Sequence, residues 1–166
     1  MKTRFYLIVI LLVSVTLCEA KNRQYPVGCY QNGYAFNLNV LQLEVGGKDV
    51  AQSMYFIHNI SDQPVTLYQM RTGEEPFNIH INNSIEQNRW AVYATDENLS
   101  KFICTIPNDS SKFGEIVSCQ EVLDVCQFTN AVFSPNGYGN YWAVNSMSVE
   151  EAIEDLRQQG NLLKTK

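Results

Sequence analysis

Short apolar runs in which hydrophobic and polar residues alternate dominate the sequence and constrain its fold more than any other feature. The clearest run spans Tyr34 to Val45 and ends at Gly46-Gly47. Alternation with a period of two residues is typical of strands with one buried face. Similar runs, separated by turn-forming residues, lie at Gln52 to Asn59, Val65 to Arg71, Phe77 to Asn82, Arg89 to Thr95, Lys101 to Ile106, Glu115 to Cys119, Cys126 to Phe133 and Asn140 to Asn145. The pattern predicts a mainly β domain, an antiparallel β-sandwich of the immunoglobulin-like or Greek-key type.

The first twenty residues predict a secretory signal peptide. Two basic residues precede an almost unbroken apolar run from Phe5 to Leu17, and the small residues Cys18 and Ala20 mark a cleavage site. A transmembrane anchor is the alternative, but the run has 13 residues, fewer than the roughly 20 that span a bilayer. A lipidated Cys18 is disfavoured, because Leu17 stands where such signals carry a small residue. We expect a mature chain without a membrane span, in the periplasm or outside the cell.

Only the C-terminal segment predicts a helix. Ser148 and Glu151 have the spacing of a capping box, and Gly160 supplies a stop signal. Four apolar residues fall at helical spacing on one face: Val149, Ala152, Ile153 and Leu156. We expect this face to dock on one end of the sandwich, and a partner-binding helix is the alternative. The predicted organisation is therefore a signal peptide over residues 1–20, a β-sandwich over 21–146, and a helix and tail over 147–166.

Four cysteines remain after the signal peptide is removed: Cys29, Cys104, Cys119 and Cys126. An even number of cysteines in an exported chain predicts two disulfides. A metal site is the alternative, but the paired spacing that structural zinc sites use does not occur. We favour Cys119 with Cys126 and Cys29 with Cys104, because Ser118 to Asp124 looks like a helical turn. The other pairing considered joins Cys104 to Cys119 across a hairpin and Cys29 to Cys126.

The charge and the motifs argue against several functions. A formal net charge of −5 argues against nucleic acid and anionic membrane surfaces as partners. With two histidines and no recognisable catalytic or phosphate-binding motif, the sequence predicts no catalytic residue, no cofactor and no metal ligand. We therefore expect a non-enzymatic binding protein. A secreted hydrolase that cleaves glycan or peptidoglycan through two carboxylates is the alternative, since two acids that meet only in space leave no motif.

Aromatic residues gather around one Gly-rich turn, from Phe133 to Trp142. Exposed aromatic side chains on a loop can anchor a partner. The candidate partner contacts are Tyr138, Tyr141 and Trp142. The alternative is that these side chains close the end of the β core.

Several stretches together are similar to those of a known family: Gly28 to Tyr34, Ser53 to Ile57, Val65 to Met70, Arg89 to Tyr93, Phe102 to Ile106, Gly114 to Cys119 and Gly139 to Val144. Over about residues 28 to 146 the chain resembles the enhanced entry protein EnhB family, small exported proteins of intracellular bacterial pathogens. The resemblance implies a periplasmic or secreted accessory factor linked to host-cell entry. It also implies a protein partner, with a larger helical-repeat envelope protein as the candidate, and it supplies no catalytic residues.

Overall fold

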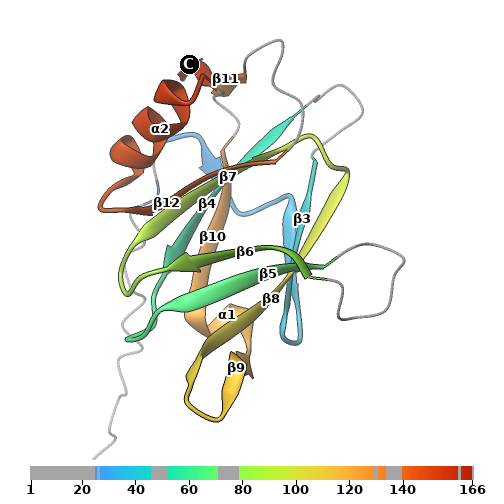
Figure 1. Ribbon diagram of the computed structural model, residues 1–166. Helices are drawn as coiled ribbons and strands as arrows, with labels where there is room; N and C mark the ends of the chain where they lie inside the picture. The colour runs from blue at the N-terminus through green and yellow to red at the C-terminus, as the bar shows by residue number, and fades with distance from the viewer. Residues whose placement is uncertain are drawn as a thin grey trace, which may run out of the picture.

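The computed structural model describes residues 25, 27–45, 52–70, 79–128, 131–133, 140–160 and 162–165. The predicted signal peptide and Tyr138 lie outside the described residues. The described chain forms two antiparallel β-sheets that pack face to face, with one helix against the outer side of one sheet (Figure 1). The predicted mainly β sandwich with a short C-terminal helix is confirmed.

Both large sheets consist of antiparallel pairs. The five-stranded sheet has the order β1 (Cys29–Tyr30), β10 (Leu123–Phe128), β4 (Ser53–Asn59), β7 (Trp90–Thr95) and β12 (Tyr141–Ser146). The six-stranded sheet has the order β2 (Tyr34–Asn37), β3 (Val40–Glu44), β8 (Leu99–Asn108), β5 (Val65–Met70) and β6 (Ile79–Ile85), and β9 (Ser111–Val117) also pairs with β8. The remaining elements are a small sheet of β11 (Ala131–Phe133) and β13 (Leu162–Thr165), and the helices α1 (Cys119–Val122) and α2 (Val149–Gln158).

The main hydrophobic core lies between the two large sheets. Alternate residues of the facing strands point into it, as the two-residue period of a strand requires. The six-stranded sheet supplies Leu41, Leu43, Val65, Leu67, Ile85 and Phe102, and the five-stranded sheet supplies Tyr55, Ile57, Ala91, Tyr93, Leu123 and Val125. Because these side chains alternate with others on each strand, the sheets must also present a second face on the outside.

A second core covers the outer face of the five-stranded sheet. There α2 packs against β7 and β12, and its residues Val149, Ala152 and Leu156 are buried. They meet side chains of the sheet, including Met54, Phe56, Val92, Cys126 and Phe128. The helix was expected at one end of the sandwich, and that position was wrong. The unbroken burial of residues 53–57 in β4 reflects cover on both faces of this sheet.

The start of α2 follows the predicted capping box with one change. The Ser148 hydroxyl accepts a hydrogen bond from the Glu151 N–H at 3.2 Å, as the box requires. The Glu151 carboxylate accepts from the Met147 N–H at 2.6 Å, one residue earlier than the usual partner. Both bonds satisfy backbone donors at the helix start and fix where α2 begins.

The docked helix predicts a graded response to truncation of its apolar side chains. Leu156 is fully buried, whereas Ile153 is only partly buried. We expect Leu156→Ala to lower the free energy of unfolding by about 3 kcal/mol and Ile153→Ala to lower it by less than half as much. Chemical denaturation of the two variants measures the difference. Equal or negligible losses would show that α2 does not pack on the sheet.

Two expected strands are each divided. The run from Tyr34 to Val45 is the hairpin of β2 and β3, in which Leu38 and Asn39 form a two-residue turn. Leu38 adopts a φ of 53° and is 86% exposed. The turn was missed because apolar Leu38 continues the alternation and no Gly marks the positive φ. The run from Cys126 to Phe133 likewise divides into β10 and β11, which belong to different sheets.

The disulfides join Cys29 to Cys126 and Cys104 to Cys119. The favoured pairing of Cys119 with Cys126 was therefore wrong, although the expected helical turn between them exists as α1. Cys119 points into the core between the sheets, whereas Cys126 points to the outer face of the five-stranded sheet. Side chains that point to opposite sides of a sheet cannot be bridged. Cys119 bonds instead to Cys104, which points into the same core.

Candidate functional site

The predicted partner contacts Tyr141 and Trp142 have packing roles. The Trp142 ring lies 4.5 Å from the Tyr93 ring and 5.6 Å from the Phe102 ring, measured between centroids, in the core between the sheets. Tyr141 is partly buried and packs against the second core. These positions correspond to the alternative in which the aromatic residues close the β core. A further candidate site lies elsewhere on the described surface.

A polar cluster surrounds Glu97 in the turn between β7 and β8. The Glu97 carboxylate accepts hydrogen bonds from Gln69 at 3.0 Å, Ser100 at 2.9 Å and Asn140 at 2.7 Å. The Tyr93 hydroxyl bonds to the Ser100 hydroxyl at 2.8 Å, and burial raises the pKa of Tyr93 to about 12. Every partner of this single carboxylate comes from a strand or its end. The cluster therefore joins the two sheets and has the features of a structural network.

A second buried tyrosine joins the sheets elsewhere. The Tyr55 hydroxyl donates to the carbonyl oxygens of Gly33, at 3.0 Å, and Glu44. Burial raises the pKa of Tyr55 to about 12. Because these contacts satisfy the hydroxyl with backbone carbonyls, Tyr55 also has a structural role.

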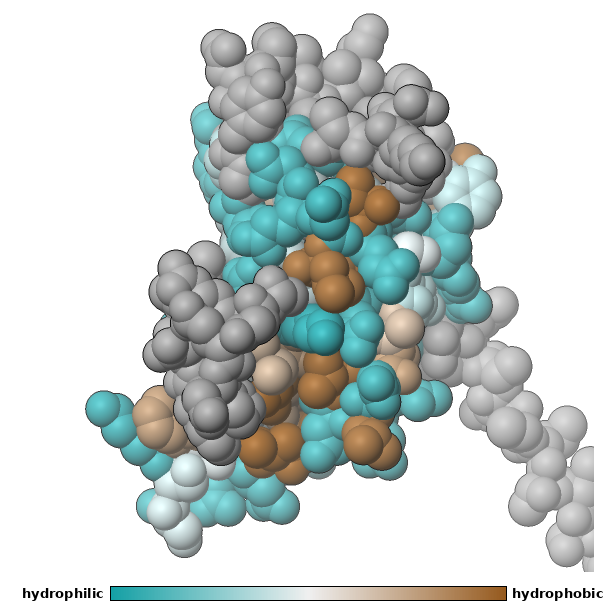
Figure 2. Space-filling view, turned by 90° about the vertical axis from the view of Figure 1, so that its right-hand side faces the viewer, coloured by the Kyte–Doolittle hydropathy of each residue, from teal (hydrophilic) through white to brown (hydrophobic). Residues whose placement is uncertain are grey.

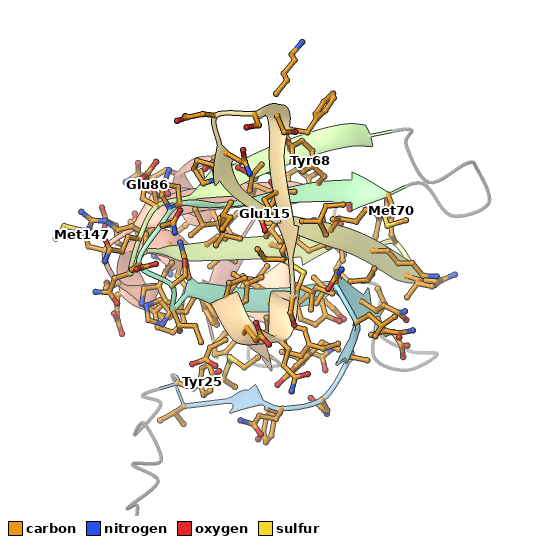
Figure 3. All side chains as sticks on the ribbon, turned by 90° about the horizontal axis from the view of Figure 1, so that it is seen from below. Tyr25, Tyr68, Met70, Glu86, Glu115 and Met147 are labelled. Atoms are coloured by element: carbon orange, nitrogen blue, oxygen red, sulfur yellow. A yellow bond between two sulfur atoms is a disulfide. The ribbon has the colours of Figure 1, made fainter. Side chains whose placement is uncertain are left out.

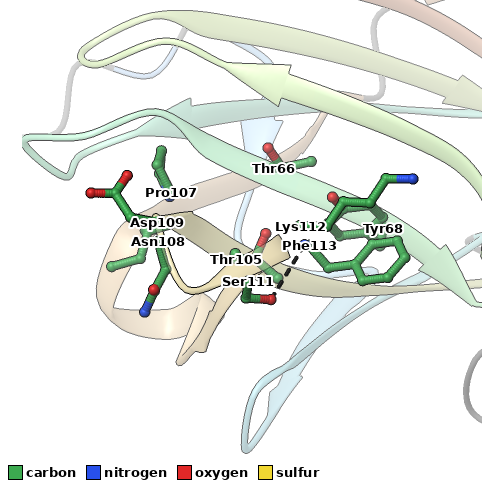
Figure 4. Close-up of a pocket in the computed structure, with 11 residues that line it drawn as sticks. Thr66, Tyr68, Thr105, Pro107, Asn108, Asp109, Ser111, Lys112 and Phe113 are labelled. Atoms are coloured by element: carbon green, nitrogen blue, oxygen red, sulfur yellow. Dashed lines mark hydrogen bonds between the residues drawn. The ribbon is translucent and has the colours of Figure 1, made fainter.

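The candidate site is a shallow groove on the outer face of the six-stranded sheet, with a volume of about 270 Å³ (Figure 4). Strands β5, β8 and β9 supply its walls, and the β8–β9 turn closes one end. Its lining combines hydroxyl, amide, charged and aromatic side chains: Thr66, Tyr68, Thr105, Asn108, Asp109, Ser111, Lys112 and Phe113. The Tyr68 and Phe113 rings meet edge to face with centroids 6.2 Å apart.

A bulge in β9 turns Phe113 toward this groove. The register between β8 and β9 shifts between Ile106 and Asn108: β8 advances two residues there while β9 advances four, from Glu115 to Ser111. Gly114 lies in the bulge with a φ of 80°, and a Cβ atom there would come within 2.3 Å of the Ile106 carbonyl oxygen. Only glycine fits this position. The bulge therefore sets Phe113 beside Tyr68.

The groove has few ionisable groups in its lining. Its lining has one carboxylate, Asp109, and one ammonium group, Lys112. Glycoside hydrolysis requires two carboxylates roughly 5 to 10 Å apart, and this groove does not provide the second one. Among the residues that the structure describes, no three His, Cys, Asp or Glu side chains lie close enough to hold a metal ion.

Two large apolar side chains are exposed next to the groove. Phe113 is 56% exposed and Ile116 is 53% exposed, and both belong to β9. We call Tyr68, Phe113, Ile116 and the adjoining groove the hairpin surface. In the view from below, Tyr68 lies on one side of the molecule and Tyr25, which packs against the second core, on the other (Figure 3). No described helix covers the side that carries the hairpin surface.

Apolar residues also reach the surface on a neighbouring side of the molecule. In the space-filling view they form a broken column with polar residues on both sides (Figure 2). The apolar residues of the hairpin surface belong to the β8–β9 hairpin, which projects at the bottom of Figure 1.

The sequence contained one signal for this site that was not used. Phe113-Gly114 lies between two predicted strands, Lys101 to Ile106 and Glu115 to Cys119, where the sequence predicts only a connection. A glycine beside an aromatic residue within a strand pattern is a sign of a bulge. The predicted contacts were placed instead around the Gly-rich turn near Trp142.

No family model matches the chain, and the comparisons with curated proteins and with solved structures found no match. Of the helices that the structure describes, neither has the length and apolar character needed to cross a membrane.

Proposed function

We propose that this protein is an exported, non-enzymatic accessory protein that binds another protein through the hairpin surface. The single observation that carries the proposal is the exposure of Phe113 and Ile116 on a projecting hairpin beside an open groove. Large apolar side chains that gather at an exposed site are typical of protein interfaces, and aromatic residues are frequent anchors there.

The two disulfides support the exported location. Cysteine pairs of this kind persist in the periplasm and outside the cell, where the environment is oxidising. The resemblance to the EnhB family adds host-cell entry or an envelope function as the proposed context, with a helical-repeat envelope protein as the candidate partner. Because its lining has one carboxylate, the groove favours this proposal over the hydrolase alternative.

Affinity capture with the tagged mature protein tests the proposal. We expect the double substitution Phe113→Ser and Ile116→Ser to reduce capture of a protein partner from an extract of the source cells by at least about tenfold, as loss of interface anchors does. Quantitative mass spectrometry of the captured proteins measures the ratio.

The matched control for this experiment is Met147→Ser. Met147 is 71% exposed, so its substitution also removes an exposed apolar side chain, but it lies between β12 and α2. Capture that falls equally in both variants, or that does not change in either, would refute the hairpin surface as the binding site.

A further inference from the structure

One edge of β9 is open. The strand pairs with β8 on its other edge, and no described strand lies beside it on the open side. The edge of β8 that pairs with β9 also pairs with β3, over residues 99–103 of β8. In turn, β2 lies beside β3. The six-stranded sheet therefore has an unfilled place next to β9, in line with β2.

The other edge strands of the two large sheets are shorter or are covered. β1 has two residues and β2 has four, whereas β9 has seven. β6 and β12 approach each other at the side of the sandwich, where the Glu86 N–H donates to the Asn145 side-chain oxygen at 2.7 Å. Proteins usually shorten, cover or bend their edge strands, because unpaired backbone groups recruit other strands. β9 is the long exposed edge in the described part of these sheets.

The hydrogen-bonding direction of each residue in β3 follows from the two-residue turn before it. In such a hairpin the residues that flank the turn bond to each other, so Val40 directs its backbone groups toward β2. The Glu44 N–H, four residues later, accordingly donates to the Gly33 carbonyl oxygen at 2.7 Å. Leu41 must then direct its groups toward β8, where its register partner is Phe102.

The same alternation continues along β8 and identifies the free groups of β9. Two and four residues after Phe102, Cys104 and Ile106 also direct their backbone groups toward the edge that β9 occupies. Their register partners are Val117 and Glu115. Ile116 lies between these two, so its N–H and C=O point away from β8, toward the open edge.

The half of β9 that holds Ile116 has less protection of its edge than the other half, since Glu115 is its one charged residue. The Gly114 bulge and Lys112 lie in the half nearer the turn, where they bend the strand and add charge. From Glu115 to Val117 the strand is regular and contains neither proline nor lysine. An exposed apolar side chain and free backbone groups therefore coincide at Ile116.

We propose that the partner protein supplies an extended segment that pairs with the open edge of β9 and becomes a further strand of the six-stranded sheet. The inference rests on the proposed function and specifies its mode. Backbone hydrogen bonds to Ile116 provide affinity, and an apolar residue opposite Ile116, with others at alternate positions, provides specificity. A segment of this kind fits the site because the edge offers both a donor and an acceptor from one residue.

Selection from a phage-displayed library of random dodecapeptides against the wild-type protein tests this mode of binding. The peptides obtained are then measured against Ile116→Pro and the matched control Ile116→Ala. Both substitutions remove the isoleucine side chain, but only proline removes the N–H. Because this N–H points away from β8, pairing within the hairpin is retained.

We expect the selected peptides to carry apolar residues at alternate positions and to bind Ile116→Pro about tenfold more weakly than Ile116→Ala, as loss of one backbone hydrogen bond predicts. Equal binding to the two variants, or a library that yields no peptide, would overturn the inference. Amide exchange in the wild-type protein provides a second measurement that does not depend on the folding of Ile116→Pro. The Ile116 amide should exchange more slowly when a selected peptide is bound, and an unchanged rate would also overturn the inference.

The two proposals fail in different ways. If the wild-type protein captures no protein partner, the proposed function is wrong. If the wild-type protein captures a partner, and the Ile116→Ala and Ile116→Pro variants capture it equally well, the hairpin surface still binds, but the binding does not use strand pairing.

Discussion

Raising the pH from 10 to 12 is expected to lower the free energy of unfolding by about 4 kcal/mol. Tyr55 and Tyr93 are fully buried, and burial raises the pKa of each to about 12. An unfolded chain releases these protons near pH 10, while the folded protein retains them. The stabilisation is therefore fully present below pH 10 and is lost as the pH rises through 12, by at most about 1.4 kcal/mol per pH unit for each tyrosine.

Urea unfolding at pH 9, 10, 11 and 12 measures this loss. The control is Tyr93→Phe, which should lose stability over the same range with about half the slope, because only one buried phenol then titrates. A stability that stays constant between pH 10 and 12 would contradict the expected burial of the two hydroxyls.

Removal of the disulfide between Cys29 and Cys126 is the second large effect. The two cysteines are 97 residues apart, whereas Cys104 and Cys119 are 15 residues apart. A bridge across a longer loop restricts the unfolded chain more, and the chain-entropy relation gives about 5 kcal/mol for the first and about 3 kcal/mol for the second. We expect replacement of Cys29 and Cys126 by alanine to lower the free energy of unfolding more than replacement of Cys104 and Cys119 by alanine.

Denaturant unfolding of the two double variants, without reductant, measures the order. Peptide mapping of the unreduced wild-type protein is the control that establishes which cysteines are joined. If removal of the bridge between Cys104 and Cys119 costs as much as removal of the other, packing in the core between the sheets outweighs the loop-length effect.

The sequence predicts the architecture because most strands alternate with a clear period. The prediction fails where the alternation of apolar and polar residues continues through a point at which the backbone turns. Leu38 is apolar and continues the alternation, yet it forms a turn and is exposed. The docking position of α2 could have been anticipated from Ser53 to Ile57, a run without alternation that is typical of a strand covered on both faces.

The disulfide pairing and the hairpin surface depend on contacts between residues far apart in the chain. Cys119 and Cys126 are near neighbours in sequence, but Cys119 lies in α1 and enters the core between the sheets, whereas Cys126 lies in β10 and enters the second core. Phe113 faces Tyr68 because of a bulge whose position depends on the pairing with β8. Neither fact can be derived from spacing alone.

The position of α2 near the end of the described chain affects how the protein can be made. A ribosome delivers the strands of the five-stranded sheet before it delivers residues 149–158. Until then the outer face that holds Met54, Phe56 and Val92 has no helix against it. A chain interrupted before Leu156 would present this apolar sheet to its surroundings, in the form that chaperones and quality-control proteases recognise.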